Sequence, residues 1–195
     1  MLKDIYQAAR LGLNPAPMYV YKPRPDGSGG ALKLNLRVGV TTETGKDGAE
    51  YVKEVDGGLF LDMVAQEGPV QKGQNARFKW DSDDTKVSCK LGLADQLALL
   101  TAIREVRYRG KPVPPALRNQ KETDQAKAQT TVSLFHKFGN SSTGILYNFQ
   151  SEGSSLRVSK SASKFRSISL TLMDELQIES YLRLAHEVYL KLGIR

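Results

Sequence analysis

The chain has 195 residues, which suits one sizeable domain or two small repeated units and excludes a disulfide-stapled miniprotein and a large multidomain enzyme. Lys and Arg number 28 against 21 Asp and Glu, and the net charge of +7 favours a polyanionic partner. With 40% hydrophobic residues, one cysteine and no apolar run of about 20 residues, the sequence predicts a cytoplasmic globular protein without a membrane span, disulfide or cysteine-based metal site.

Residues 1–30 are interpreted as an N-terminal arm. Lys3–Leu13 predicts a short helix that ends at Asn14-Pro15, because proline stops a helix. Tyr19-Val-Tyr-Lys22 then predicts an edge strand, followed by a turn.

Residues 31–109 predict four strands followed by a helix. Apolar and polar side chains alternate over Leu32–Val40, a pattern typical of a half-buried strand, and a second strand is expected at Leu59–Val64. Arg77–Trp80 and Lys86–Leu91 are separated by a polar turn, which predicts a hairpin. A helix at 94–109 follows.

A linker at 110–130 and a second unit at 131–195 complete the predicted domain. Pro112, Pro114 and Pro115 end the helix, and the polar remainder predicts a mobile connection. Beyond it, four strands are expected at 131–138, 144–150, 155–160 and 165–172, and a helix is expected at 174–192. The apolar face of that last helix is broad enough to pack partly on another chain.

The two units are related by a weak internal repeat. Leu91–Arg104 aligns with Leu170–Arg183, so that Asp174 lies 79 residues after Asp95. Chance similarity between two amphipathic helices is the alternative. The sequence therefore predicts one α+β domain with two four-stranded antiparallel sheets, each followed by a helix, a ββββα unit repeated twice.

The positive charge is concentrated in 94–130 and 131–172. The second of these segments has five basic residues and one acidic residue, and it is rich in serine and aromatic residues. A solvated basic surface is the simpler explanation. Single-stranded nucleic acid, however, needs aromatic rings for stacking, cations for phosphates, and small polar groups between them.

Strand alternation selects the candidate nucleic-acid-binding residues, which share outward positions or basic and aromatic character. The alternative interpretation of Trp80 and Tyr147 is that they belong to the hydrophobic core. For Phe135 and Phe165, the alternative is a contact with another subunit. The predicted residues are Lys33, Arg37, Arg77, Lys79, Trp80, Lys86, Lys90, Phe135, Lys137, Tyr147, Arg157, Lys160, Lys164, Phe165, Arg166 and Ser167.

The arrangement resembles the Whirly family of single-stranded-DNA-binding proteins, and more loosely the PUR-repeat and kinetoplastid guide-RNA-binding proteins. The likeness lies in the doubled four-strands-then-helix plan, in Phe78-Lys-Trp-Asp-Ser82, and in Phe165–Met173 before the last helix. The plant signature Lys-Gly-Lys-Ala-Ala-Leu is absent, so the chain resembles a distant or phage-type member. The resemblance implies sheets that bind single strands and a homotetramer assembled through the helical side.

The functional expectation is a largely sequence-independent single-stranded DNA-binding protein of replication, repair or transcription. RNA binding by the same fold, and a structural or phage assembly protein whose aromatics form subunit contacts, are the alternatives. His136 and His186 lack metal-site spacing, and Asp81, Asp83 and Asp84 lack the glycine and distal glutamate of a calcium loop. We therefore expect no enzyme activity, no metal, no cofactor and no membrane partner. The expected location is the cytoplasm, or the host cytoplasm or nucleoid if the protein is phage-encoded.

Overall fold

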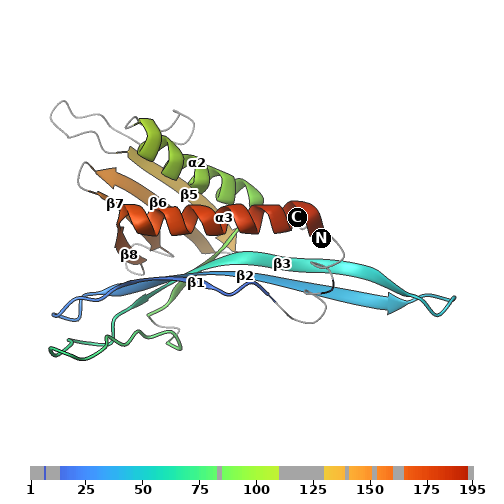
Figure 1. Cartoon of the computed structure of the whole chain (residues 1–195), viewed down its shortest axis with the longest axis horizontal. Coiled ribbons are helices and arrows are strands. Elements are labelled where there is room, and N and C mark those ends of the chain that lie inside the picture. The colour runs from blue at the N-terminus through green and yellow to red at the C-terminus, as the bar shows by residue number, and fades with distance from the viewer. Residues whose placement is uncertain are drawn as a thin grey trace.

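The computed structural model describes residues 7, 14–82, 85–109, 130–138, 141–150, 153–159 and 165–192, with side chains for these except 105–109, 130–153 and 159. Strands β1 to β4 form one antiparallel sheet in that order, the first sheet, and β5 to β8 pair in that order (Figure 1). The elements are β1 (Met18–Lys22), β2 (Gly30–Thr44), β3 (Glu50–Ala65), β4 (Val87–Leu91), α2 (Leu93–Arg109), β5 (Thr130–Phe138), β6 (Ser141–Gln150), β7 (Gly153–Ser159), β8 (Phe165–Leu170) and α3 (Leu172–Leu192).

The alternation in β2 determines which side of the first sheet is buried. Leu34 and Leu36 are fully buried, whereas Lys33 is half-buried and Arg37 is exposed. Because successive side chains of a strand point to opposite sides, the leucines face the helices and the cations face away. We call the side of the first sheet that faces away from the helices the outer face.

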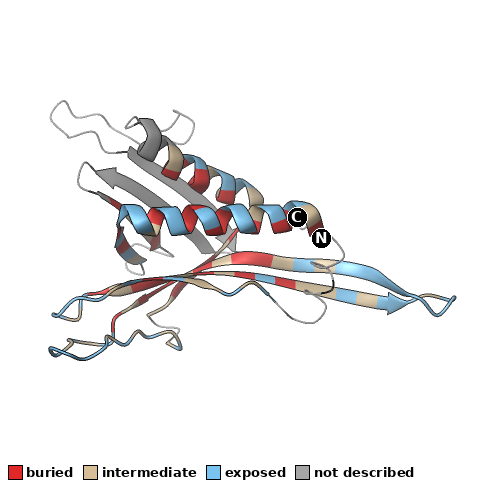
Figure 2. Cartoon of the chain, viewed as in Figure 1, coloured by how far each residue is buried: buried red, intermediate tan, exposed pale blue. Residues whose placement is uncertain are grey.

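The hydrophobic core lies between the first sheet, the two helices and strands β7 and β8. Helix α3 contacts β1, β2 and β8, and β8 contacts β2 and β3. Apolar side chains from all these elements form one cluster. Figure 2 shows buried positions gathered where β2 and β3 pass beneath α3.

Two tyrosine hydroxyls of α3 complete the hydrogen bonding of the first sheet. The Leu36 N–H, beyond the last residue paired with β1, donates to the Tyr181 hydroxyl at 3.2 Å. The Leu59 N–H donates to the Tyr189 hydroxyl at 2.8 Å, and that hydroxyl donates to the Leu91 carbonyl at 3.5 Å, where β4 ends. A buried N–H without a partner costs about 1–3 kcal/mol, so these bonds fix the position of α3 on the sheet.

A buried carboxylate joins the two helices. Glu179 of α3 is 4% exposed and accepts hydrogen bonds from Arg104 Nε of α2 at 2.8 Å and from Arg183 Nη2 at 2.6 Å. A buried charge is costly unless it is paired, and here two guanidinium groups pair with it. Arg104 and Arg183 are also equivalent positions of the sequence repeat, so the related helices meet at one acid.

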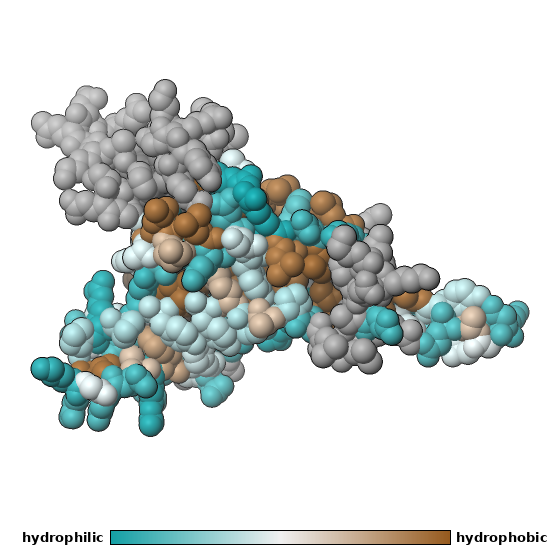
Figure 3. Space-filling model, viewed as in Figure 1, coloured by the Kyte–Doolittle hydropathy of each residue, from teal (hydrophilic) through white to brown (hydrophobic). Residues whose placement is uncertain are grey.

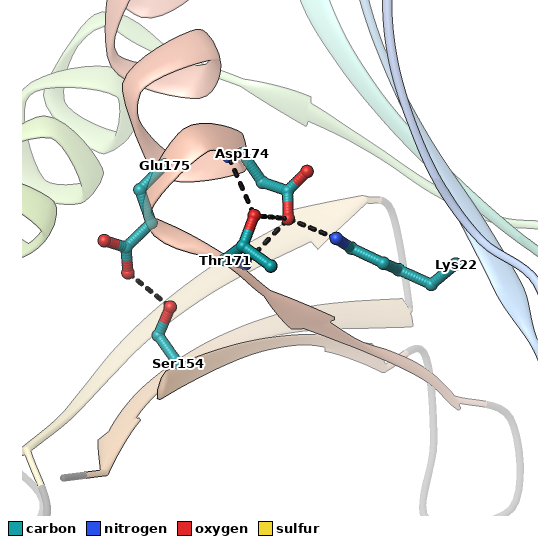
Figure 4. Close-up of polar contacts among 5 residues, drawn as sticks. All are labelled: Lys22, Ser154, Thr171, Asp174 and Glu175. Atoms are coloured by element: carbon teal, nitrogen blue, oxygen red, sulfur yellow. Dashed lines mark hydrogen bonds and ion pairs between the residues drawn. The ribbon is translucent and has the colours of Figure 1, made fainter. Parts of the chain in front are cut away.

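The first turn of α3 is tied to both sheets (Figure 4). The Thr171 N–H donates to Asp174 Oδ2 at 2.7 Å and the Asp174 N–H donates to Thr171 Oγ1 at 3.3 Å, which forms a capping box. Asp174 also forms an ion pair with Lys22 of β1, and Ser154 of β7 donates to the buried Glu175. Burial would raise the pKa of Asp174, but the hydrogen bonds from Lys22 and Thr171 outweigh burial and lower it.

Strands β2 and β3 continue beyond the rest of the first sheet as a two-stranded ribbon. We call residues 41–56 the β2–β3 arm. Its turn closes with a bond from the Gly48 N–H to the Gly45 carbonyl at 3.0 Å, and Gly48 has a φ of 77°, which favours glycine. Most of the β2–β3 arm is exposed (Figure 2).

The predicted fold class, two equivalent ββββα repeats in 31–109 and 131–195, is wrong. The range 31–109 contains three strands, because β1 comes from the expected N-terminal arm and Arg77–Trp80 forms no strand. The part of the chain with described side chains comprises the four-stranded first sheet, the pair β7 and β8, and two helices. The long β2–β3 ribbon also has no counterpart of similar length among β5 to β8.

The predicted hairpin between Arg77–Trp80 and Lys86–Leu91 is also wrong. The two segments do not pair with each other: β4 pairs with Leu59–Met63 of β3, and Phe78 forms an isolated bridge with Gln66, the residue after β3. Both segments therefore lie in succession along β3 and the residue that follows it.

Several predicted elements are confirmed. The edge strand at Tyr19–Lys22 is β1, and the helices expected at 94–109 and 174–192 are α2 and α3. Asp95 accepts a hydrogen bond from the Gly92 N–H at 2.8 Å at the start of α2. The predicted N-terminal helix and the linker 110–130 lie outside the described residues, apart from Gln7 and Thr130.

We expect Tyr189→Phe to lower the free energy of unfolding by about 1–3 kcal/mol, because it leaves the Leu59 N–H buried without an acceptor. Urea denaturation measures this change. The matched control is Tyr51→Phe on the exposed β2–β3 arm, which should change stability by less than about 0.5 kcal/mol. Equal stabilities of the two variants would show that the buried hydroxyl does not hold α3.

The same hydroxyls predict a loss of stability in alkali. Burial raises the pKa of Tyr181 and Tyr189 above the ordinary 10.0 and outweighs the hydrogen bonds that lower it. The resulting stabilisation is complete below pH 10.0 and is lost as the pH rises through the raised pKa values, because the unfolded state releases these protons first. Urea denaturation at increasing pH should show this decline. If the free energy of unfolding of the Tyr181→Phe/Tyr189→Phe variant declines with pH as steeply as that of the parent protein, these two hydroxyls do not cause the decline.

Candidate nucleic-acid interface

Four aromatic side chains form a row on the outer face, which we call the aromatic strip: Trp80, Tyr19, Tyr21 and Phe78. The Tyr19 and Tyr21 rings are stacked, with centroids 5.6 Å apart and planes 7° apart. Trp80 meets Tyr19 edge-on at 5.6 Å, and Phe78 lies 5.2 Å from Tyr21. Contiguous exposed aromatic groups mark interaction surfaces more often than isolated ones do.

The alternation of β1 places the two tyrosines outside. Val20 is buried in the core, so Tyr19 and Tyr21 project to the outer face, where they are 37% and 49% exposed. Burial, and then the neighbouring Tyr19, raises the pKa of Tyr21. The Tyr21 hydroxyl is therefore a protonated donor at neutral pH.

A buried glutamine holds the loop that carries the other two rings. Gln66 Oε1 accepts from the Arg24 N–H at 2.8 Å, while its Nε2 donates to the carbonyls of Arg24 at 2.8 Å and Gly68 at 2.7 Å. A Cβ at Gly29 would lie 2.2 Å from Gln66 Oε1, so this close approach requires glycine. The Lys79 N–H also donates to the Ala65 carbonyl at 3.2 Å, which brings the loop to the outer face.

Cations lie beside the rings. Lys33 Nζ is 5.7 Å from the Tyr19 ring centroid, and the Arg37 guanidinium is 5.3 Å from that of Phe60. The side chain of Lys90 lies over Gly58 of the neighbouring strand, where a Cβ would lie 2.5 Å from Lys90 Cε. The outer face thus combines flat apolar rings with positive charges that reach past them.

A second aromatic–cation pair lies on β7 and β8. The Arg157 guanidinium is 3.7 Å from the centroid of the Phe165 ring, which is 37% exposed. Ser167 is exposed and pairs with Arg157 in the strand register. Arg166 points to the opposite side of β8 with Ile168, and its Nη1 donates to the Phe165 carbonyl at 2.8 Å. Arg166 therefore lies on the other side of β8 from Phe165 and Ser167, and its role in binding stays a prediction.

The structure brings seven of the other predicted residues with described side chains into two groups. Trp80 is half-buried within the aromatic strip rather than in the core, with exposed Arg77 and Lys79 beside it in the chain. Lys86 is half-buried and precedes β4. The first group, on the outer face, comprises Lys33, Arg37, Trp80 and Lys90, and the second comprises Arg157, Phe165 and Ser167. Arg77 instead lines a separate pocket with Glu67 and Gln74.

Five predicted residues lie outside this description. Phe135, Lys137 and Tyr147 belong to β5 and β6, whose side chains are outside the described residues. Lys160 and Lys164 are outside the described residues altogether.

The sequence reasoning missed Tyr19, Tyr21, Phe60 and Phe78 as members of the outer face. The signal for the tyrosines was the alternation across Val20, which was recognised as a strand but not followed to its two faces. For Phe60, the signal was its place between the core residues Leu59 and Leu61.

A second exposed surface is apolar, and it adjoins the aromatic strip because Tyr19 belongs to both. A groove of about 620 Å³ runs between β1 and α3 and is lined by Met18, Met173, Leu176 and Leu184, among others. Figure 3 shows hydrophobic patches over α3 and a hydrophilic tip on the β2–β3 arm.

Over the described parts of the chain, no three His, Cys, Asp or Glu side chains are grouped to hold a metal ion, and Cys89 is buried. No described helix has the length and hydropathy needed to cross a membrane.

No known protein-family model matches the chain, and a search of curated proteins also finds no match. The resemblance to the Whirly family stays a prediction.

We expect Gln66→Ala to lower the free energy of unfolding by about 1–3 kcal/mol, because it removes three hydrogen bonds at a buried position. Thermal and urea denaturation measure the loss. Gln71→Ala, at an exposed position of the same loop, is the control and should leave stability nearly unchanged. If both variants unfold like the parent protein, Gln66 does not hold the loop.

Proposed function

We propose that the protein binds single-stranded nucleic acid on the outer face of the first sheet, largely without sequence preference. The observation that supports this proposal is the aromatic strip with Lys33 and Arg37 beside it. Bases stack on the aromatic rings and the cations neutralise the phosphates. The site offers stacking to every base, since every base has a flat face.

A single strand fits this surface better than a duplex does. The bases of a duplex are stacked on one another and paired, so they cannot lie on Tyr19 or Tyr21. A row of aromatic rings can stack with bases only where those bases are not stacked on one another. Single-stranded DNA is the proposed ligand, and RNA is the alternative for the same chemistry.

The Arg157–Phe165 pair supports a second contact with the same strand. One side of the Phe165 ring is covered by the guanidinium, and the ring remains 37% exposed. A base stacked on the ring would lie beside a positive charge, with the exposed Ser167 as a hydrogen-bonding group.

The proposal includes a cytoplasmic, non-enzymatic role in replication, repair or transcription, in a homo-oligomer. A structural or assembly role is the second candidate. It is favoured by the apolar groove along α3, where Met173 is 63% exposed and Leu184 is also exposed.

Titration with labelled oligo(dT) and with a matched duplex over a salt series tests the proposal. We expect the single strand to bind more tightly than the duplex. Its affinity should fall steeply as the salt concentration rises, because Lys and Arg side chains that bind phosphates release the counterions of the nucleic acid. Tyr19→Ala/Tyr21→Ala should weaken binding by about 1–3 kcal/mol for each base that loses its stacking partner.

Leu190→Ala is the matched control, because Leu190 is exposed on α3 and away from the outer face. The Leu190→Ala variant should bind oligo(dT) with the affinity of the parent protein. Phe165→Ala and Arg157→Ala test the second contact in the same way. Absence of single-strand binding at low salt would overturn the proposed function.

A further inference from the structure

A single acidic side chain lies among the rings and cations of the outer face. Leu61 and Met63 are buried in the core, so the alternation of β3 directs Asp62 to the outer face. Asp62 pairs with Lys33 of β2 and with Ser88 of β4. Among the described strand residues at the end of the outer face that carries the rings, Asp62 is the one acid.

The strand register sets Asp62 in one row with Tyr19, Lys33 and Ser88 across the four strands. The row consists of a ring, a cation, a carboxylate and a hydroxyl. Neighbouring strands are about 4.8 Å apart, so Asp62 lies about 10 Å from Tyr19 across the sheet. Phe60 lies on the same side of β3, about 7 Å from Asp62 along the strand. The carboxylate therefore lies between two aromatic side chains of the outer face rather than at its margin.

The Asp62 carboxylate has acceptor sites to offer a ligand. Lys33 Nζ lies 5.7 Å from the ring centroid of Tyr19 on β1, whereas Asp62 is on β3, the other neighbour of β2. Over the residues with described side chains, the carboxylate makes no hydrogen bond or ion pair. Asp62 is nonetheless half-buried, and an ionised carboxylate has about four lone-pair sites that need donors. A ligand with N–H groups at this place would supply such donors.

Phosphates and base edges respond to a carboxylate in opposite ways. A phosphate close to Asp62 is repelled, because both groups are negative. The exocyclic amino group of cytosine, in contrast, donates a hydrogen bond that a carboxylate accepts. Thymine and uracil carry a carbonyl oxygen at the same position, and two acceptors repel each other. Base edges with amino groups are thus the part of a single strand that fits Asp62.

We propose that Asp62 selects bases that carry an exocyclic amino group, cytosine above uracil and thymine, when a single strand lies on the outer face. The inference rests on the proposed function and adds one preference to binding that is otherwise independent of sequence. Every base still stacks on the rings, so strands of thymine bind, but more weakly. Lys33, Arg37 and Lys90 contact phosphates whatever the base, and Asp62 accepts from the base edge.

Fluorescence anisotropy with labelled oligo(dC) and oligo(dU) of equal length, at neutral pH and low salt, tests the inference. The two strands have the same backbone and ring size, and their bases differ only at the amino or carbonyl group and the ring nitrogen beside it. We expect the parent protein to bind oligo(dC) about fivefold more tightly than oligo(dU), which is the lower end of the discrimination that a well-placed side chain gives.

Asp62→Asn separates a contact with the base from a general effect of charge. An amide both donates and accepts, so it accommodates cytosine and uracil alike, and the ratio of the two affinities should fall to about one. A carboxylate that only repels phosphates, or only holds Lys33, would leave that ratio unchanged, because both strands would respond equally. The matched control is Asp56→Asn, which removes the same charge from the same side of β3 about 20 Å away and should keep the parent ratio.

The outcomes separate this inference from the proposed function. Equal affinity of the parent protein for the two strands, tighter binding of oligo(dU), or a ratio that persists in Asp62→Asn would overturn the inference and leave single-strand binding in place. If the parent protein binds neither strand at low salt, the proposed function and the inference both fail. The strand comparison uses the parent protein alone, so it tests the inference even if Asp62→Asn does not fold.

Discussion

The contact between α3 and the first sheet is the constraint on which the rest of the structure depends. Tyr181 and Tyr189 insert their hydroxyls where β1 and β4 stop supplying backbone partners to β2 and β3. These bonds keep the helix on one side of the sheet at one position. They leave the opposite side, where Tyr19 and Tyr21 are 37% and 49% exposed, free of helices over the described part of the chain. A buried polar contact on one face thus determines which face of the sheet carries the exposed tyrosines.

The net charge has a different meaning once it is placed on this face. A total of +7 is compatible with any polyanion. On the outer face, however, the cations lie beside aromatic rings at one end, and the acidic β2–β3 arm lies at the other. The basic end with its aromatic rings supports the proposed ligand, which combines phosphates with flat bases.

Strand and helix positions were predictable where burial leaves a periodic pattern. The alternation of Leu32 to Val40 identified β2, and the 3.6-residue period identified both helices, because one side of each element enters the core. The first half of β3 was missed because the β2–β3 arm is exposed on both sides and has no apolar period. The erroneous hairpin arose because nothing in the sequence of Arg77–Trp80 reveals that Phe78 bridges to Gln66, the residue after β3. In the candidate site, strand parity located Lys33, Arg37 and Lys90, but the contact between Trp80 and Tyr19 joins segments distant in sequence and depends on tertiary structure.

The central claim is that bases stack on the aromatic strip of the first sheet. Trp80 is the single tryptophan of the chain and lies at one end of this strip, so its fluorescence reports on the site alone. Titration with oligo(dT) should quench or shift the Trp80 emission, with a midpoint equal to that of binding measured by anisotropy of the labelled strand. Strong binding by anisotropy with unchanged Trp80 emission would contradict the account, because the strand would then lie on another surface.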